Sequence, residues 1–260
     1  MGAKCVDNPE VILQTSIDKG VAKVAKPWLA KWLLGFVGGA MIALGFLADV
    51  RVSAAIPASN GSTLIGASAF PIGLIVILLA GGELVTGNMM AVSTAAFAKR
   101  LKWTAFWQNL VVITVANVIG AMAVAFFFGH FVGLTATGAF KTAVITMAQG
   151  KIQASFWQSL VSGIGCNWFV GLAVWLSFGA KDAAGKVLGI WFPIMIFVAT
   201  GFQHSIANAF LIPAAIFEGG ATWGQFAMNL IPVYLGNIIG GAVFVGGLYY
   251  YSYFKSLKSA

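Results

Sequence analysis

Long apolar segments, separated by short polar ones, make up almost the whole chain. A helix that crosses a bilayer needs about 20 mostly apolar residues. Four segments reach this length without interruption, and two more reach it in two pieces each. The uninterrupted segments are 28–47, 106–128, 156–178 and 230–253, and the interrupted ones are 64–98 and 187–217. The pattern predicts six membrane-spanning helices, the second and fifth broken, because backbone groups in lipid must pair within their own segment.

Charged residues are too few to cover a soluble protein of this length. They make up 8% of the chain, against about 25% in soluble domains, which excludes soluble enzymes, disordered chains and nucleic-acid-binding proteins. The excess of 15 Lys+Arg over 7 Asp+Glu instead reports membrane topology. With both ends inside, only Arg51, Lys141 and Lys151 fall in outer segments. This distribution predicts a multi-pass protein of the inner (plasma) membrane with both termini cytoplasmic.

Residues 1–27 are predicted to form a cytoplasmic N-terminal amphipathic segment. Asn8 suits a helix N-cap and Pro9 suits the first helical position. Apolar residues with interleaved lysines favour a helix at the membrane surface, and a poorly ordered tail is the alternative. No signal peptide is expected, because residues 1–26 contain no apolar h-region.

Two similar motifs occupy the interruptions of the second and fifth spans. Residues 81–88 read GGELVTGN and residues 201–208 read GFQHSIAN, 120 residues apart. The same offset pairs other uncommon residues: Trp103 with Trp223, Asn109 with Asn229, and Asn117 with Asn237. No equally clear match links the first and fourth spans. Because each copy holds three spans, the two must be inverted. The chain is therefore predicted to be a single transport domain with repeats at about 28–128 and 155–254.

Broken helices in matching positions indicate a transport site near the membrane midplane. Irregular backbone survives at that depth only when it is buried in protein or lines a wet cavity. The half-helices are expected to restart near Asn88 and Ser205, where their N-termini would present N–H donors and positive potential to an anion. A pair of glycine-rich packing kinks is the alternative.

The interruptions carry ionisable side chains, which in a membrane indicate function by default. Glu83 is the only carboxylate placed at membrane depth, and we expect it to support the broken backbone. His204 is the only histidine placed there, and we expect a role in transport; the alternative is a histidine that seals the break by hydrogen bonding. His130 is expected at the outer interface. A hydroxyl and two amides add polar groups at this depth: Thr86, Asn167 and Asn208.

At these motifs the chain resembles the formate/nitrite transporter family. The resemblance rests on residues 81–88, 165–168 with 172–175, 201–208 and 235–241. It implies an aquaporin-like, all-α membrane fold of six helices in inverted repeats. It also implies a homopentamer in which each protomer has its own pore. Family members pass formate, nitrite, hydrosulfide or lactate. Aquaporins themselves are disfavoured, because the chain has no Asn-Pro-Ala.

The resemblance also implies roles for single residues. Three resemble the pore constrictions of the family: Leu74, Leu84 and Phe197. Thr86 resembles the mobile-loop threonine beside the central histidine, here His204. Asn167 resembles a pore-facing asparagine, and Lys151 resembles the lysine near the outer mouth. One departure concerns Gln203, because the family carries Glu just before the histidine, so a carboxylate that could tune the histidine is missing.

Together these features predict a channel or transporter for small monovalent anions of weak acids, first of all formate. A bare anion among Leu and Phe side chains loses hydration worth several kcal/mol. Protonating an acid of pKa about 4 at pH 7 costs roughly 4 kcal/mol, so passage is expected to be linked to protons at His204 once Lys151 and Lys141 have concentrated the anion. Nitrite, hydrosulfide or lactate are alternative substrates.

The alternative from another class is a subunit that anchors an enzyme complex in the membrane. Such a subunit usually needs metal or haem ligands, and two histidines with Cys5 and Cys166 supply no such set. No metal, no cofactor and no enzyme activity are therefore expected. The expected partners are the anion or its neutral acid, protons, the lipid bilayer and further copies of the chain.

Overall fold

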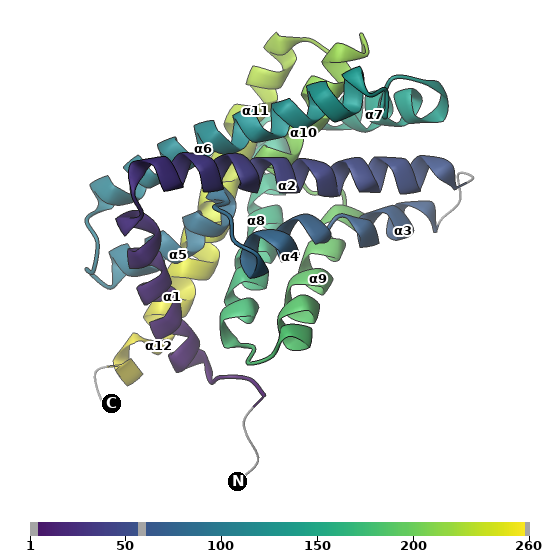
Figure 1. Ribbon diagram of the computed structural model, residues 1–260. Coiled ribbons are helices and arrows are strands. Elements are labelled where there is room, and N and C mark those ends of the chain that lie inside the picture. The colour runs from purple at the N-terminus through teal and green to yellow at the C-terminus, as the bar shows by residue number, and fades with distance from the viewer. Residues whose placement is uncertain (1–4, 57–60, 258–260) are drawn as a thin grey trace.

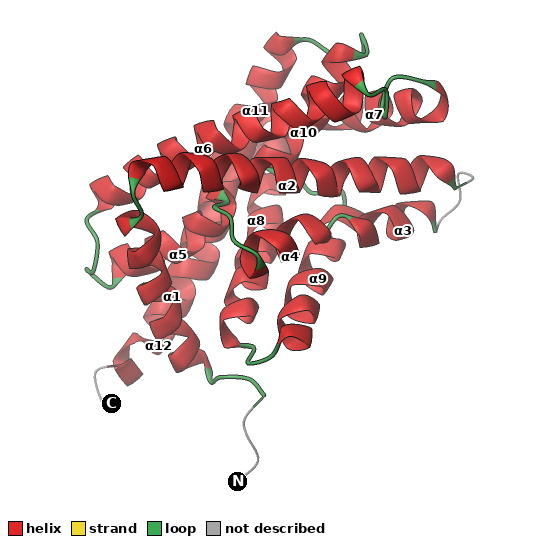
Figure 2. Ribbon diagram, viewed as in Figure 1, coloured by secondary structure: helices red, strands yellow, loops and turns green. Residues whose placement is uncertain are grey.

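The computed structural model describes residues 5–56 and 61–257, and every regular element in this part of the chain is a helix (Figure 2). The first half contains α2 (Trp28–Ala55), α3 (Ser62–Ala69), α4 (Ile72–Leu79), α5 (Val85–Phe97), α6 (Trp103–Val124) and the π-helix η1 (Ala125–Phe131). The second half contains α8 (Phe156–Gly179), α9 (Ala183–Ala199), α10 (Ser205–Phe217), α11 (Trp223–Ile238), the π-helix η2 (Ile239–Gly247) and α12 (Leu248–Leu257). One further helix precedes each half: α1 (Pro9–Ala25) and α7 (Gly138–Ile152).

Five helical segments are long and apolar enough to cross a membrane: Trp28–Ala55, Ser62–Leu79, Trp103–Phe131, Phe156–Gly179 and Trp223–Phe254. α9 has 17 residues and is shorter than these, and α10 continues beyond the break that follows it. The interruptions fall where the sequence predicts them, after α4 and after α9. The third span of each half also contains a π-helical stretch, a local widening that is often found at functional sites.

Several helix ends differ from those expected. α2 continues to Ala55 instead of ending at residue 47, so Asp49 lies inside a membrane-length helix. Asp49 is thus a second carboxylate, besides Glu83, that lies in a segment of membrane-spanning length. α5 begins at Val85, three residues before the expected restart near Asn88, whereas α10 begins at Ser205 as expected.

Corresponding hydrogen bonds show the internal repeat directly. The Val85 N–H donates to Asn117 Oδ1 over 2.9 Å, and the Ser205 N–H, 120 residues later, donates to Asn237 Oδ1 over 2.9 Å. Each asparagine thus pairs the first backbone donor of a half-helix, which otherwise has no intrahelical partner.

The repeat also includes the first and fourth spans, at an offset of 128 instead of 120. Asn117 Nδ2 donates to Gly35 O over 2.6 Å, and Asn237 Nδ2 donates to Gly163 O over 2.9 Å. The first half has eight more residues between its first and second spans, so a search at one offset misses this match.

Close packing of α2 on α6 and of α8 on η2 explains two matching glycines. A Cβ at Gly120 would lie 2.1 Å from Phe36 O, and one at Gly240 would lie 2.4 Å from Ile164 O. Small residues at these positions let the backbones approach, which is a main source of attraction between helices in a membrane. Figure 1 shows α2 and α6 lying alongside one another.

The helices that precede the two halves also occupy matching places. α1 packs on α5, and α7 packs on α10. α1 begins at Pro9, after Asn8, as expected. It buries Ile12 and Leu13 against the bundle and leaves Val11 47% exposed. Part of its apolar face therefore packs on protein, and part stays exposed. α1 also packs against α12, so the first and last described helices lie together (Figure 1).

Candidate transport site

Two cavities occupy positions that are related by the internal repeat. The larger has a volume of about 1130 Å³ and is lined by α2, α3, α7, α9 and the start of α10. The smaller has a volume of about 220 Å³ and is lined by α1, α4, α8 and α9. Matching positions of the two halves line both cavities: Asp49 and Ser177, Phe70 and Ile190, Val198 and Leu78. The two cavities are therefore counterparts in the inverted repeat.

His204 joins the two broken helices. Its ring is 2% exposed and caps α10, with Nδ1 accepting the Ala207 N–H over 3.0 Å. Nε2 lies 3.0 Å from Oγ1 of Thr86, a fully buried residue of α5. Because Nδ1 accepts a backbone donor, the proton of the neutral ring is on Nε2, which then donates to Thr86. The predicted pair of His204 and Thr86 is thus a direct contact between the two interruptions.

The two residues of this contact do not correspond to each other in the internal repeat. His204 corresponds to Leu84, and Thr86 corresponds to Ile206, each pair being 120 residues apart. Each half therefore contributes one polar and one apolar side chain to the junction.

Aromatic side chains cover the junction on the side of the larger cavity. The ring of Phe197 stacks on His204, with centroids 5.9 Å apart, and Phe70 meets Phe197 edge-on, with centroids 5.6 Å apart. Phe70 and Phe197 both line the larger cavity. Of these two rings, only Phe197 was predicted, and it was predicted from the resemblance to the family; Phe70 was not.

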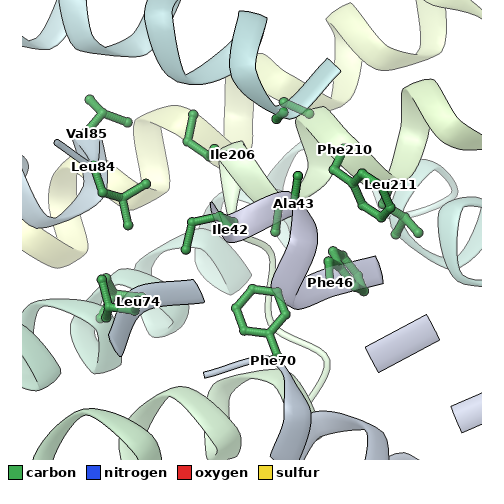
Figure 3. Close-up of a cluster of buried hydrophobic side chains, with 14 of the residues drawn as sticks. Ile42, Ala43, Phe46, Phe70, Leu74, Leu84, Val85, Ile206, Phe210 and Leu211 are labelled. Carbon is green, nitrogen blue, oxygen red and sulfur yellow. The ribbon is translucent and has the colours of Figure 1, made fainter. Parts of the chain in front are cut away.

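Leucines close the path toward the smaller cavity. Along the second span, Phe70 lines the larger cavity and Leu78 lines the smaller one. Leu74 lies between them, is 1% exposed, and lines neither cavity. Leu84 is 2% exposed and lies near Leu74, with Ile42 beside both (Figure 3). A solute that moved between the cavities would therefore meet apolar side chains on both sides of the His204–Thr86 pair.

Asn167 is fully buried beside this junction. Its amide donates to Thr86 O over 3.2 Å and to Asn237 O over 2.6 Å, so it ties α8 to both neighbouring elements. Its Oδ1 has no hydrogen-bond partner among the described residues. Asn167 does not line either cavity, and its predicted place on the substrate path remains a prediction.

Glu83 is the acceptor that organises the first break. Its side chain is 3% exposed; Oε2 accepts Lys23 Nζ over 3.0 Å and Asn88 Nδ2 over 2.8 Å. Lys26 Nζ lies 3.7 Å from Oε1. The carboxylate is therefore paired with two cations, which a buried charge requires. This arrangement agrees with the supporting role predicted for Glu83.

Gln203 takes the same place in the second break without a charge. Its Oε1 accepts Asn208 Nδ2 over 2.8 Å and Asn229 Nδ2 over 2.9 Å. Its Nε2 donates to Ser159 Oγ over 3.1 Å and to Lys151 O over 3.3 Å. An ionised carboxylate could accept from the Ser159 hydroxyl, but it could not bond the Lys151 carbonyl, because it has no donor. Donation by Nε2 thus gives a structural reason for glutamine at position 203. Asn208, predicted on the substrate path, lines the larger cavity from this network.

Lys151 lines the larger cavity beside the second break. Its Nζ donates to Gly201 O over 2.7 Å and to Phe202 O over 3.1 Å, which pairs two carbonyl groups of the broken segment. Burial lowers the pKa of Lys151 from 10.5 to about 8. Lys141, the other lysine expected to attract the anion, is not among the residues that line this cavity.

Comparison with known proteins identifies the family. The family model described as "Formate/nitrite transporter" matches residues 10–251. The chain belongs to the formate/nitrite transporter family. It is 55% identical to the uncharacterized transporter YrhG of Bacillus subtilis, over 96% of this chain and 95% of that protein. It is 47% identical to the formate channel BtFdhC of Bacillus thuringiensis, over 95% and 96% of the two chains.

A solved structure described as a pentameric formate channel with formate bound has the same fold. It superimposes with a TM-score of 0.76 at 29% identity, covering 87% of this chain and 98% of that one. The predicted fold class, an all-α membrane protein with broken helices in inverted repeats, is confirmed. The family consists of channels and transporters, so the chain is a transport protein and not an enzyme.

The structure narrows one expectation about the half-helix ends, because three of their N–H donors are already paired. The N-termini of α5 and α10 were expected to offer N–H donors to an anion. The structure instead pairs the donors of Val85, Ser205 and Ala207 with Asn117, Asn237 and His204. The partial positive charge of the helix ends remains, but these three donors are not available to a ligand.

Two buried carboxylates of this transporter were missed. Asp49 lines the larger cavity, and a longer first span was the signal that could have placed it there. Glu218 is 4% exposed at its side chain, and its Oε1 lies 3.1 Å from His130 Nδ1. His130, expected at the outer interface, is thus also half of a polar pair between η1 and the end of α10.

Proposed function

We propose that this member of the formate/nitrite transporter family is a channel for small monovalent anions of weak acids, with formate as its main substrate. The observation that carries the proposal is the His204–Thr86 contact, buried between apolar side chains and between two matching cavities. A relative and a solved structure that are both described as formate channels support the choice of formate.

Passage is linked to protonation at the central histidine. Lys151 attracts the anion into the larger cavity, where apolar walls strengthen its field. Stripping a bare anion of water at Phe70 and Phe197 costs several kcal/mol, which is comparable with the roughly 4 kcal/mol needed to protonate formate at pH 7. Near His204 a proton from water joins the anion, because apolar surroundings disfavour the charged form, and a neutral acid passes the leucines. The Nε2–H of His204 and the hydroxyl of Thr86 hydrogen-bond the solute there.

The topology follows from charge. Both termini are cytoplasmic, the larger cavity faces outward, and the protein lies in the inner (plasma) membrane. The packing of α1 against α12 supports two ends on one side. The whole chain, 1–260, acts as one transport domain with protons as a second partner. It assembles as a homopentamer, supported by the pentameric description of the solved relative.

Flux measurements in proteoliposomes test this function. The purified chain is expected to raise formate flux above that of empty vesicles from pH 5 to pH 8. His204→Ala should lower the flux at pH 7 by about tenfold, less than the hundredfold that a positioned acid or base contributes to a chemical step, and should change its pH dependence. His130→Ala, the other histidine, is the control. If His204→Ala keeps the wild-type pH profile, the histidine has no part in the mechanism. If the wild-type protein carries no formate, formate is not its substrate.

A further inference from the structure

A carboxyl group forms part of the wall of the larger cavity. Asp49 of α2 is 4% exposed and lines this cavity together with Lys151 of α7. Ser53 Oγ donates to Asp49 Oδ1 over 2.8 Å. α3 passes close behind the carboxyl, because a Cβ at Gly66 would lie 2.3 Å from Oδ1. The carboxyl is therefore held against its own helix and α3, with the cavity on its other side.

The smaller cavity has no carboxyl at the matching position. Ser177 lies 128 residues after Asp49 and lines that cavity, with its hydroxyl donating to Val174 O over 2.7 Å. A hydroxyl fills the place without disturbing the fold, so the repeat architecture does not require an acid there. The carboxyl of Asp49 is therefore specific to the larger cavity and is not required by the repeated fold.

The other charged groups around Asp49 are few. The titratable residues that line the same cavity are Lys151 and His204. Arg51, on the same helix, turns away: its Nη1 donates to Leu134 O over 3.2 Å, and its guanidinium lies 3.4 Å from the centre of the Phe140 ring. An anion that Lys151 attracts therefore enters a space whose one carboxyl is Asp49, among the described lining residues.

We propose that Asp49 exchanges a proton with the weak-acid anion in the larger cavity before the solute reaches His204. Two carboxylates that share one site hold one proton between them, because their like charges disfavour double ionisation. The O–H bond of the Asp49 carboxyl breaks as an oxygen of the anion takes the proton. A neutral acid and the Asp49 carboxylate result, and water on the outer side returns a proton to the carboxylate.

This step deepens the proposed function and rests on it. It moves the neutralising proton transfer to the cavity side of Phe70 and Phe197, with Asp49 as the donor in place of water near His204. The solute then crosses both aromatic rings as a neutral acid and meets the His204–Thr86 pair as a hydrogen-bonding partner. It also makes the two ends of the conduit unequal, because the Ser177 hydroxyl has no comparable acidity.

Formate uptake by Asp49→Asn vesicles tests the step, with Ser177→Ala as the control from the matching position. At pH 7 the Asp49→Asn rate should fall about tenfold, which is less than the hundredfold that a positioned acid contributes to a chemical step. At pH 5 it should approach the wild-type rate, because water then supplies the neutral acid. Asp49→Glu should restore the wild-type profile, and Ser177→Ala should keep it.

The experiment distinguishes a variant that fails to assemble from one that assembles but lacks the proton transfer. Asp49→Ser copies the residue of the other cavity and serves if Asp49→Asn does not assemble, as checked by size-exclusion chromatography. A rate that changes by the same factor at every pH, or that rises at every pH, would overturn the role of Asp49 alone. No formate flux in the wild type would overturn the proposed function and this step together.

Discussion

The two broken helices share one hydrogen-bonding frame but differ in charge. In each break an asparagine of the following helix pairs the first N–H of the half-helix, and a second asparagine binds residue 83 or 203. In the first break that residue is Glu83, a carboxylate neutralised by Lys23 and Lys26. In the second it is Gln203, an amide that donates as well as accepts.

This difference separates what the fold needs from what transport uses. The fold needs an acceptor at this position and the asparagines around it, since both breaks have them. We propose that transport uses the position that follows, where Leu84 in one break is replaced by His204 in the other. In the first break, where Leu84 occupies this position, the acceptor is part of a charged pair. In the second break, where His204 occupies it, the network is neutral and no carboxylate precedes the histidine in sequence.

The largest expected effect is the loss of stability when the acceptor of either break, residue 83 or residue 203, is removed. The comparison tests whether the charge of Glu83 contributes to stability. Glu83→Ala leaves the partly buried ammonium of Lys23 without its partner, and breaking a buried ion pair costs about 3–5 kcal/mol. Gln203→Ala removes only neutral hydrogen bonds, and its partners keep other bonds, so the expected loss is about 1–3 kcal/mol, the cost of one unpaired group. Thermal unfolding of the assembled protein in detergent compares the two. Equal losses would show that the charge of Glu83 adds nothing to its role as an acceptor.

A smaller effect is expected from the lysine beside the second break. The pKa of Lys151 is lowered to about 8, so its charge is present below that pH and is lost as the pH rises through it. Lys151→Met should lower formate uptake at pH 6 and low ionic strength by about tenfold, the lower end of electrostatic attraction. The difference from wild type should vanish above pH 8, because the wild-type lysine is then neutral as well.

Lys141→Met is the matched control, since Lys141 does not line the larger cavity. An uptake deficit in Lys151→Met that persists unchanged at pH 9 would mean that Lys151 acts by pairing the carbonyls of Gly201 and Phe202 instead of by attracting the anion.

Much of the fold could be predicted from the sequence, because a bilayer leaves few solutions. Apolar length set the spans, and the repeated Gly and Asn of residues 81–88 and 201–208 set the breaks. The match between the first and fourth spans was missed, because eight extra residues shift its offset and because it consists mainly of glycines such as Gly35 and Gly163. Close backbone approach leaves no distinctive side chain to detect.

The site was predicted in part, for a similar reason. His204 and Thr86 stand inside the motifs, and the structure brings them into contact. Asp49 lies in the part of α2 beyond the predicted span, and Phe70 lies in a turn outside the repeated motifs. The pairing of the half-helix donors by Asn117 and Asn237 depends on side chains more than 30 residues away, so no local pattern could reveal it.

Chemical blockage beside His204 tests most directly whether the two breaks line a conduit. Ala207 lines the larger cavity one turn into α10, and Ala207→Cys can be made in a chain that lacks Cys5 and Cys166. Formate flux is measured before and after reaction with a small thiol-specific reagent, and the extent of reaction is measured by mass spectrometry. The structure predicts that modification abolishes the flux while the unsubstituted background is unaffected. Complete modification with undiminished flux would contradict a path between the breaks.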